Sequence, residues 1–151
     1  MDFGIIGYGY TGQQHARGLR SISGTHLAAI AENDASRTAG VNAKTYLDYR
    51  DLLQDTSIQA VTVCLPHFLH EQVTADALNA GKHVLVEKPL AISVGAGKRL
   101  CKLAERVSRV LMVEMTHRFM PPVAEARQIV QAGRLGKILA VTETLFENVG
   151  L

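Results

Sequence analysis

Short apolar runs alternate along this chain with longer segments in which apolar residues recur every three or four positions. Runs such as Ala60–Leu65 and His83–Val86 are nearly continuous and rich in β-branched residues, which is typical of parallel strands covered on both faces. The other expected strands are Asp2–Ile6, His26–Glu32, Lys44–Tyr46 and Val110–Glu114. The expected helices are Thr11–Ser21, Ala35–Gly40, Tyr49–Gln54, Leu69–Ala80 and Val94–Val107. This alternation predicts an α/β fold, with a doubly wound, mostly parallel sheet and right-handed crossovers.

The alternation stops near residue 120. Pro121-Pro122 opens a segment with helical periodicity, Val123–Ala132, and a strand pattern follows over Ile138–Phe146. Both faces of that strand carry apolar residues, and an unpaired edge strand of this kind needs covering or invites association. We therefore expect a first domain over residues 1–120, then a helix and one strand of an incomplete second α+β domain over residues 121–151. The strand is expected to pair with a second copy in a homodimer.

The composition is that of a globular domain large enough to bury a core, with 47% hydrophobic and 20% charged residues in 151. The net charge is +2 and basic residues are scattered, so no nucleic-acid partner is expected. No apolar run approaches the roughly 20 residues that span a bilayer, so no membrane partner is expected. A basic leader is absent, and Cys64 and Cys101 are isolated. We interpret both as reduced core residues of a cytoplasmic protein, with no disulfide or metal role.

The loop after the first expected strand has a G-x-G-x-x-G pattern. Its residues are Gly7, Tyr8, Gly9, Tyr10, Thr11 and Gly12. The first glycine permits a tight turn, the second lets the backbone approach a phosphate, and the third lets the helix pack close to the strand. Unpaired N–H groups and the positive end of the helix dipole then face the phosphate. The pattern predicts a dinucleotide pyrophosphate site, although glycine loops also form turns that bind nothing.

Glu32 ends the second expected strand, 20 residues beyond Gly12. A carboxylate there can accept hydrogen bonds from both adenine-ribose hydroxyls, and its charge repels a 2′-phosphate. Glu32 thus favours nicotinamide adenine dinucleotide (NAD) over its 2′-phosphate form (NADP). The simpler interpretation is a polar residue at a strand end. Arg37 leaves NADP possible, because an arginine just past this strand can meet a 2′-phosphate.

Glu87-Lys88-Pro89 follows the fifth expected strand. In an open α/β sheet, ligands bind beyond the carboxyl ends of the strands. The Lys88 ammonium there can polarise a carbonyl or stabilise a developing alkoxide, which makes it the catalytic candidate. By position alone, a solvated loop lysine before an ordinary turn proline is an equally good interpretation.

The run Ala80–Leu90 closely resembles the signature of the Gfo/Idh/MocA oxidoreductases, which include glucose–fructose oxidoreductase and inositol 2-dehydrogenase. The resemblance spans essentially the whole chain. Further motifs occur in the family's order and spacing: the glycine loop, Glu32, Tyr46 with Leu52-Leu53, Pro66 with His70, and Arg118-Phe119. Gly133–Ile138 is similar to the family's entry into its second domain.

The resemblance implies an N-terminal Rossmann domain that binds NAD or NADP. It also implies hydride transfer between the nicotinamide and a hydroxyl-bearing carbon of a sugar or cyclitol. Lys88 would stand at the nicotinamide and substrate, Glu87 would shape the cofactor pocket, and Pro89 would follow a peptide bond that is often cis. Leu65, Pro66, His67 and His70 would lie along the cofactor cleft.

Two histidines and one arginine need separate comment. His67 stands where the family often has asparagine, and either His67 or His70 taken alone is more often a helix-start or surface residue than a catalyst. No zinc site is expected from the pair without a further ligand nearby. Arg118 is counted with the cofactor-binding candidates. It would bind a substrate oxygen or, as we favour, pair with a carboxylate at the domain junction.

Family enzymes continue for roughly another 200 residues, an ordinary domain's length. That part carries the usual catalytic Asp and His and the dimer face. Two functional hypotheses follow from the resemblance. The chain is the cofactor-binding portion of a sugar or polyol dehydrogenase, or it is a catalytically silent dinucleotide-binding module that acts as a sensor or interaction protein.

Overall fold

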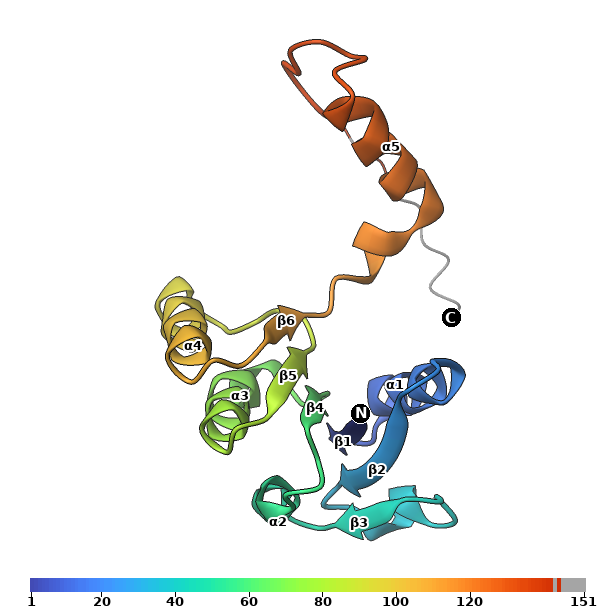
Figure 1. Ribbon diagram of the computed structural model, residues 1–151, viewed down its shortest axis with the longest axis vertical. Coiled ribbons are helices and arrows are strands. Elements are labelled where there is room, and N and C mark those ends of the chain that lie inside the picture. Colours follow the sequence, from blue (N-terminus) through green and yellow to red (C-terminus); the bar gives the residue numbers. More distant parts are fainter. Residues whose placement is uncertain (143, 145–151) are drawn as a thin grey trace. The chain divides into compact units, whose positions relative to one another are not determined.

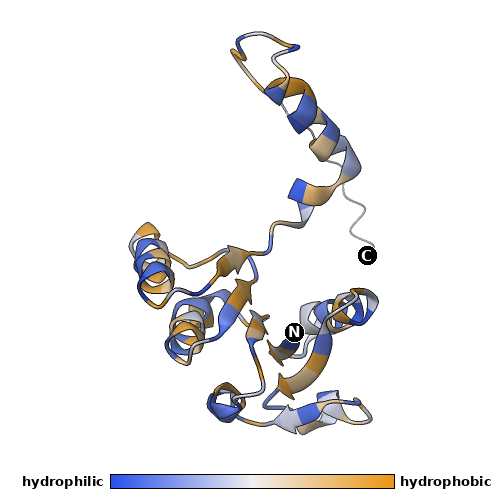
Figure 2. Cartoon of the chain, in the orientation of Figure 1, coloured by the Kyte–Doolittle hydropathy of each residue, from blue (hydrophilic) through white to orange (hydrophobic). Residues whose placement is uncertain are grey.

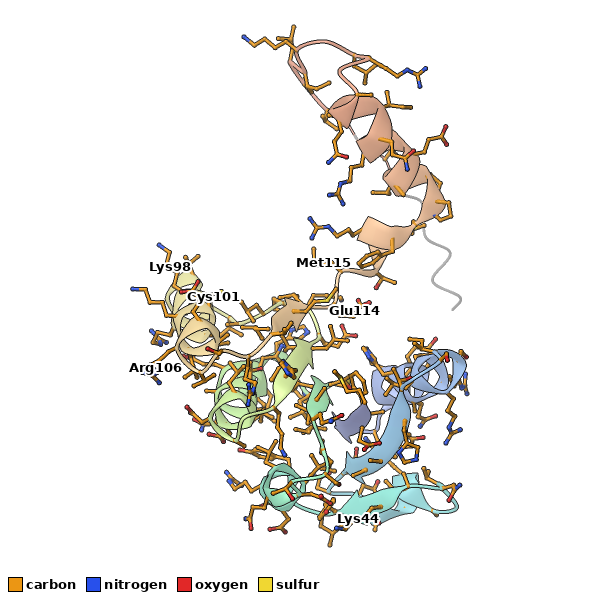
Figure 3. All side chains as sticks on the ribbon, in the orientation of Figure 1. Lys44, Lys98, Cys101, Arg106, Glu114 and Met115 are labelled. Atoms are coloured by element: carbon orange, nitrogen blue, oxygen red, sulfur yellow. The ribbon has the colours of Figure 1, made fainter. Side chains whose placement is uncertain are left out.

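A computed structural model of the chain describes residues 1–142 and 144. The chain divides into two compact units, Met1–Glu114 and Met115–Leu151. Figure 3 labels Glu114 and Met115, the residues on either side of this division. The division falls earlier in the chain than the boundary expected after residue 120. That residues 121–151 begin a second domain stays a prediction.

The first unit contains a six-stranded parallel sheet with strand order β3-β2-β1-β4-β5-β6 (Figure 1). The strands are β1 (Asp2–Ile6), β2 (His26–Ala31), β3 (Lys44–Tyr46), β4 (Ala60–Val63), β5 (His83–Val86) and β6 (Leu111–Val113). The sequence of strands and the doubly wound fold are therefore confirmed. Observed strands end one or two residues inside some expected limits, because the last residues of β2, β4 and β6 turn into the loops above the sheet.

Helices cover both faces of the sheet. The helices of this unit are α1 (Tyr10–Ser21), α2 (Tyr49–Gln54), α3 (His70–Asn79) and α4 (Val94–Arg106), with the single 3₁₀ turns η1 (Ala35–Thr38) and η2 (His67–Leu69). The helix α1 packs on one face, and α2, α3 and α4 lie on the other (Figure 1). The α-helix expected over Ala35–Gly40 is wrong. The Asp34 carboxylate accepts the Ser36 N–H, which stabilises a short 3₁₀ turn instead of a longer helix.

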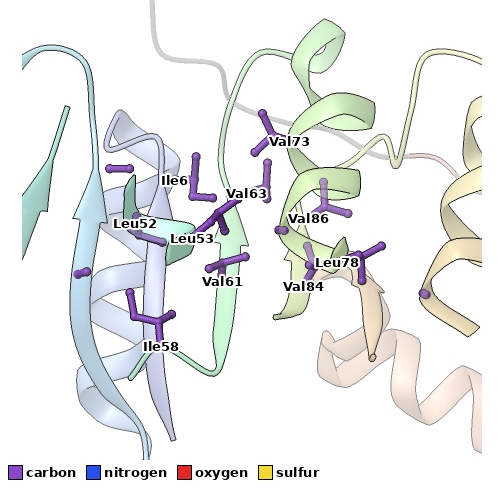
Figure 4. Packing of buried hydrophobic residues seen from close by; sticks show 14 residues of the cluster. Ile6, Leu52, Leu53, Ile58, Val61, Val63, Val73, Leu78, Val84 and Val86 are labelled. Carbon is purple, nitrogen blue, oxygen red and sulfur yellow. The ribbon is translucent and has the colours of Figure 1, made fainter. Parts of the chain in front are cut away.

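Two apolar clusters, one on each face, hold this arrangement together. The larger contains Leu52 of α2, Leu78 of α3 and Val61 of β4, all essentially inaccessible (Figure 4). The smaller joins Ile5 and Ile30 to the apolar side of α1. Figure 2 shows the inner strands as mostly hydrophobic, as expected for a parallel sheet buried on both faces.

The amino edge of the sheet is fastened by two buried or half-buried polar groups. The Asp55 carboxylate accepts hydrogen bonds from Ser57 (2.7 Å), Tyr46 (2.8 Å) and Lys44 (3.0 Å). These bonds hold the pKa of that carboxyl well below its usual range. The buried Lys82 ammonium donates to the backbone oxygens of Asp55 (2.7 Å) and Ile58 (2.8 Å), and burial lowers its pKa. Lys82 thus ties the start of β5 to the loop before β4.

The second unit contains the 3₁₀ turn η3 (Thr116–Phe119) and the helix α5 (Pro121–Gln131). The helix starts with prolines in its first turn, where their missing N–H groups cost nothing. Residues 138–142 and 144 form neither helix nor strand, so the expected strand Ile138–Phe146 is not formed there, and its other residues lie outside the described part. A strand needs a neighbour for its backbone groups, and the dimer that would supply one stays a prediction. Among the described residues, no helix is long and apolar enough to cross a membrane.

Candidate cofactor-binding site

The glycine loop connects β1 to α1, and two of its glycines are required by the protein's own packing. Gly7 has φ +91°, a conformation that side chains disfavour, and a Cβ there would overlap the Cys64 carbonyl oxygen. A Cβ on Gly12 would overlap the carbonyl oxygen of Gly7. These two glycines let α1 start directly over the end of β1.

Gly9 differs from its two neighbours in the motif. Its backbone is in an ordinary extended conformation, with φ −69°, and the nearest heavy atom to an added Cβ is the Arg37 Nη1, 3.9 Å away. The protein's packing therefore leaves open space above Gly9. Gly9 is also the N-cap of α1, and no side chain caps that helix start. Open space above uncapped N–H groups at a helix N-terminus suits a phosphate group.

Glu32 follows β2 and is held rigidly beside this loop. One carboxylate oxygen accepts the Tyr8 N–H at 2.8 Å, and the other accepts the Asp34 N–H at 3.1 Å. The side chain is 6% exposed, and the guanidinium of Arg37 lies 3.8 Å from it. Arg37 also lies 3.3 Å from the Asp34 carboxylate. The carboxylate predicted for the ribose therefore has a fixed position next to the glycine loop.

A cavity of about 560 Å³ opens at the carboxyl ends of β1, β2 and β4. The chain leaves β1 toward β2 on one side and returns to β4 on the other, which is the switch point where open α/β sheets bind ligands. The lining residues are Ile6, Gly7, Gly9, Ala31, Glu32, Asn33, Arg37, Leu47, Tyr49, Arg50, Cys64, Leu65, Pro66, Leu69, Gln72 and Val73. Five predicted site residues are among those that line this cavity: Gly7, Gly9, Glu32, Leu65 and Pro66.

Tyr49 and Arg50 line this cavity although the sequence reasoning did not select them. The Arg50 guanidinium lies 4.7 Å from the centre of the Tyr49 ring. The Tyr49 hydroxyl donates to the Asp76 carboxylate at 2.8 Å, and partial burial together with that carboxylate raises the pKa of Tyr49 to about 12. The sequence could have indicated Tyr49 and Arg50 only by their position just after β3, at the edge of the sheet where ligands bind. Cys64 also lines the cavity and stays a neutral thiol, because burial raises its pKa to about 12.

The Glu87-Lys88-Pro89 segment leaves β5 at the same edge, and the Lys88–Pro89 peptide is cis. The Glu87 N–H donates to Val63 at 3.0 Å, and its carboxylate lies 3.1 Å from Nε2 of His15 on α1. The Lys88 side chain is exposed. His15 was not among the predicted residues, because the only indication in the sequence is its place on the first turns of α1.

The two histidines after β4 occupy different environments. His67, in η2, is exposed. His70 has no exposed surface and lies beneath the cavity wall, with Nδ1 2.7 Å from the Pro89 oxygen and Nε2 2.8 Å from the Leu65 oxygen. Arg118 belongs to η3 in the second unit. Contacts of His67, His70, Arg118, the exposed Tyr10 and the half-buried Thr11 with a cofactor stay predictions. Over residues 1–142 and 144, no three His, Cys, Asp or Glu residues gather closely enough to hold a metal ion.

A parallel sheet of this order, with a glycine loop and a buried acidic residue at its switch point, defines a Rossmann-type dinucleotide-binding domain. Residues 1–115 match the model of the Gfo/Idh/MocA group, described as an oxidoreductase family with an NAD-binding Rossmann fold. The chain belongs to this family.

Similar proteins include an inositol 2-dehydrogenase of Saccharopolyspora erythraea, 33% identical over 99% of this chain and 46% of that protein. An NAD-binding oxidoreductase from Klebsiella pneumoniae has a TM-score of 0.83 at 31% identity, over 90% of this chain and 40% of that one. A scyllo-inositol dehydrogenase from Lactobacillus casei, solved with NAD(H) and scyllo-inositol, has a TM-score of 0.83 at 26% identity, over 90% and 42%. The chain thus spans less than half of each of these relatives.

Proposed function

We propose that this chain is the cofactor-binding part of an NAD-dependent dehydrogenase that acts on a sugar or cyclitol. The observation that carries the proposal is the open space above Gly9, beside the uncapped start of α1. Gly7 and Gly12 serve the packing of the loop itself, whereas a glycine at position 9 has no such use within the protein. A bound pyrophosphate gives it one, with Gly9, Tyr10 and Thr11 offering backbone N–H groups.

NAD is the preferred cofactor in this proposal because of Glu32. Its carboxylate is anchored by two backbone N–H groups and keeps lone pairs for ribose hydroxyls, while its charge repels a 2′-phosphate. Arg37, the group that could favour NADP, lies within 4.0 Å of two carboxylates, those of Glu32 and Asp34. Its charge is largely compensated there, so a phosphate gains less from it.

When bound, the nicotinamide would supply the hydride chemistry. The role assigned to Lys88 is to hold its ammonium near the substrate oxygen and stabilise negative charge there as an alcohol and a carbonyl interconvert. Glu87 holds the segment in place through Val63 and His15. A polyol substrate class is favoured because a relative is named inositol 2-dehydrogenase and a solved relative holds scyllo-inositol.

The test is a fluorescence titration of the 151-residue chain with NADH and, separately, NADPH. We expect NADH to bind, NADPH to bind more weakly, and Gly9→Ala to lose at least about tenfold in affinity, because a methyl group would occupy the phosphate position. Gly18→Ala, on the exposed side of the same helix, is the matched control and should bind normally. Equal binding by wild type and a folded Gly9→Ala variant would remove the basis of the proposal.

A further inference from the structure

His70 joins two loops that the proposed site uses. It begins α3 and is fully buried, yet each of its ring nitrogens lies within hydrogen-bond distance of a backbone carbonyl oxygen. One of these oxygens belongs to Leu65, which follows β4 and lines the cavity. The other belongs to Pro89, which follows β5. The two distances, 2.8 and 2.7 Å, are at the short end of the range for such bonds.

The contact at Pro89 lies one residue beyond Lys88. On the other side of Lys88, the backbone N–H of Glu87 donates to the Val63 oxygen at 3.0 Å. The backbone that carries Lys88 is therefore held at both ends, upstream by β4 and downstream by the His70 ring. The Lys88 side chain itself is exposed, so the backbone anchors are what set its origin relative to the cavity.

We propose that His70 is a positioning residue, whose buried imidazole fixes the Lys88 segment against the cavity wall at Leu65. It acts by donating a ring N–H to these backbone carbonyls rather than by touching the cofactor, to one of them as a neutral imidazole and to both only when both ring nitrogens carry protons. The functional consequence rests on the proposed function, because it assumes that Lys88 works beside the nicotinamide. The positional consequence, that the place of Lys88 depends on His70, does not.

Lys82 provides a matched comparison within the same sheet. Its buried ammonium also bridges two backbone carbonyls, those of Asp55 and Ile58, but at the opposite edge of the sheet from the cavity. His70→Leu and Lys82→Met each remove a buried donor and keep most of the side-chain volume. Both should destabilise the fold, and only the first should disturb the cofactor edge.

The experiment follows the ¹³C signal of reductively methylated Lys88, assigned with Lys88→Arg, under conditions where every variant is folded. In the free protein we expect the signal to move in His70→Leu, to return partly in His70→Gln, which keeps an N–H donor, and to stay in place in Lys82→Met. We expect the Kd for NADH to rise about tenfold in His70→Leu, because the Lys88 segment would move from its place beside the cofactor. In Lys82→Met the Kd should stay within about twofold of the wild-type value.

Each failure has its own signature. An unchanged Lys88 signal in a folded His70→Leu variant overturns the positioning role, whatever the cofactor does. If the wild-type Lys88 signal fails to respond to saturating NAD⁺, the proposed function of Lys88 is refuted, while the positional result still stands on the free protein. If Lys82→Met shifts the Lys88 signal as much as His70→Leu does, general loosening explains both and the proposal fails.

Discussion

Replacing Gly12 with alanine should lower the stability of the fold, whereas the same replacement at Gly18, further along α1, should raise it. A Cβ on Gly12 would lie closer than 3.0 Å to the Gly7 oxygen, a backbone atom that cannot rotate away. Gly7 is itself tied to Ala31 by a 2.9 Å hydrogen bond, so the glycine loop cannot yield. Around Gly18 there is no heavy atom within 4 Å of an added Cβ. The two changes are chemically identical and differ only in what the methyl group meets.

The magnitudes follow from two opposing terms. Alanine is favoured over glycine in a helix by about 1 kcal/mol, which applies at both positions. Overpacking costs roughly 1–3 kcal/mol, and we take the upper end at Gly12 because the obstacle is backbone. The net effects are about 2 kcal/mol of destabilisation for Gly12→Ala and about 1 kcal/mol of stabilisation for Gly18→Ala. At about 2–4 °C per kcal/mol for a chain of this size, the two Tm values should differ by about 6–12 °C.

The chain has no tryptophan, so unfolding is best followed by far-ultraviolet circular dichroism. Urea titrations at constant temperature give the free energies directly, with equal m values as the check that both variants unfold from comparable states. A Gly12→Ala variant as stable as wild type would show that the loop relaxes around the methyl group. The tight contact between α1 and β1 would then not be a structural requirement.

Two further predictions concern the amino edge of the sheet. The hydrogen bonds to Asp55, first among them from Ser57, hold its pKa below the ordinary value of 3.8, so its stabilising contribution is complete above about pH 4 and is lost as the pH falls toward the folded pKa. Urea unfolding between pH 2 and 6 should therefore show a steeper acid loss in wild type than in Asp55→Asn, and parallel pH profiles would contradict this. Lys82→Met takes the ammonium donor from the buried Ile58 carbonyl oxygen and leaves the Asp55 oxygen with only the 3.3 Å bond from the Ile58 N–H, which should cost roughly 1–3 kcal/mol. Lys102→Met, at an exposed position on α4, should change stability by less than about 0.5 kcal/mol, and equal losses for the two would refute the burial argument.

The fold could be predicted because its signals are local. Strands such as β4 and β5 are continuous apolar runs, and each helix shows its own periodicity, so element order alone led to a doubly wound sheet. The prediction of an element was wrong where the local pattern was right but the segment was too short or lacked a partner. The segment after Asp34 looked helical, but a side-chain cap and only a few residues produced a single 3₁₀ turn. The segment from Ile138 has the apolar pattern of a strand. A strand also needs a neighbouring strand for its backbone hydrogen bonds, and an apolar pattern does not provide one.

Part of the lining of the candidate site could be predicted from the sequence, and the residues that could not be predicted have a common physical reason. Gly7, Glu32 and Pro66 stand at strand ends, where topology alone brings them together. The contact between His15 and Glu87 joins residues 72 positions apart, and no local pattern encodes such a pairing. The burial of His70 is likewise set by tertiary packing. From the sequence, a histidine just after a turn that begins at a proline is expected at the surface.

The structure also changes how much the glycine motif says about a ligand. Gly7 and Gly12 would be required even in a protein that binds nothing, because side chains there would collide with the protein's own carbonyl groups. Of the three glycines in the motif, only Gly9 stands where a side chain would meet no protein backbone, so this one position of the motif carries the information about a ligand. Glu32 adds a second, independent indication, since a buried carboxylate held by two N–H groups has lone pairs to offer. A chain with intact first and third glycines but a bulky residue at the second should therefore fold like this one and fail to bind a dinucleotide.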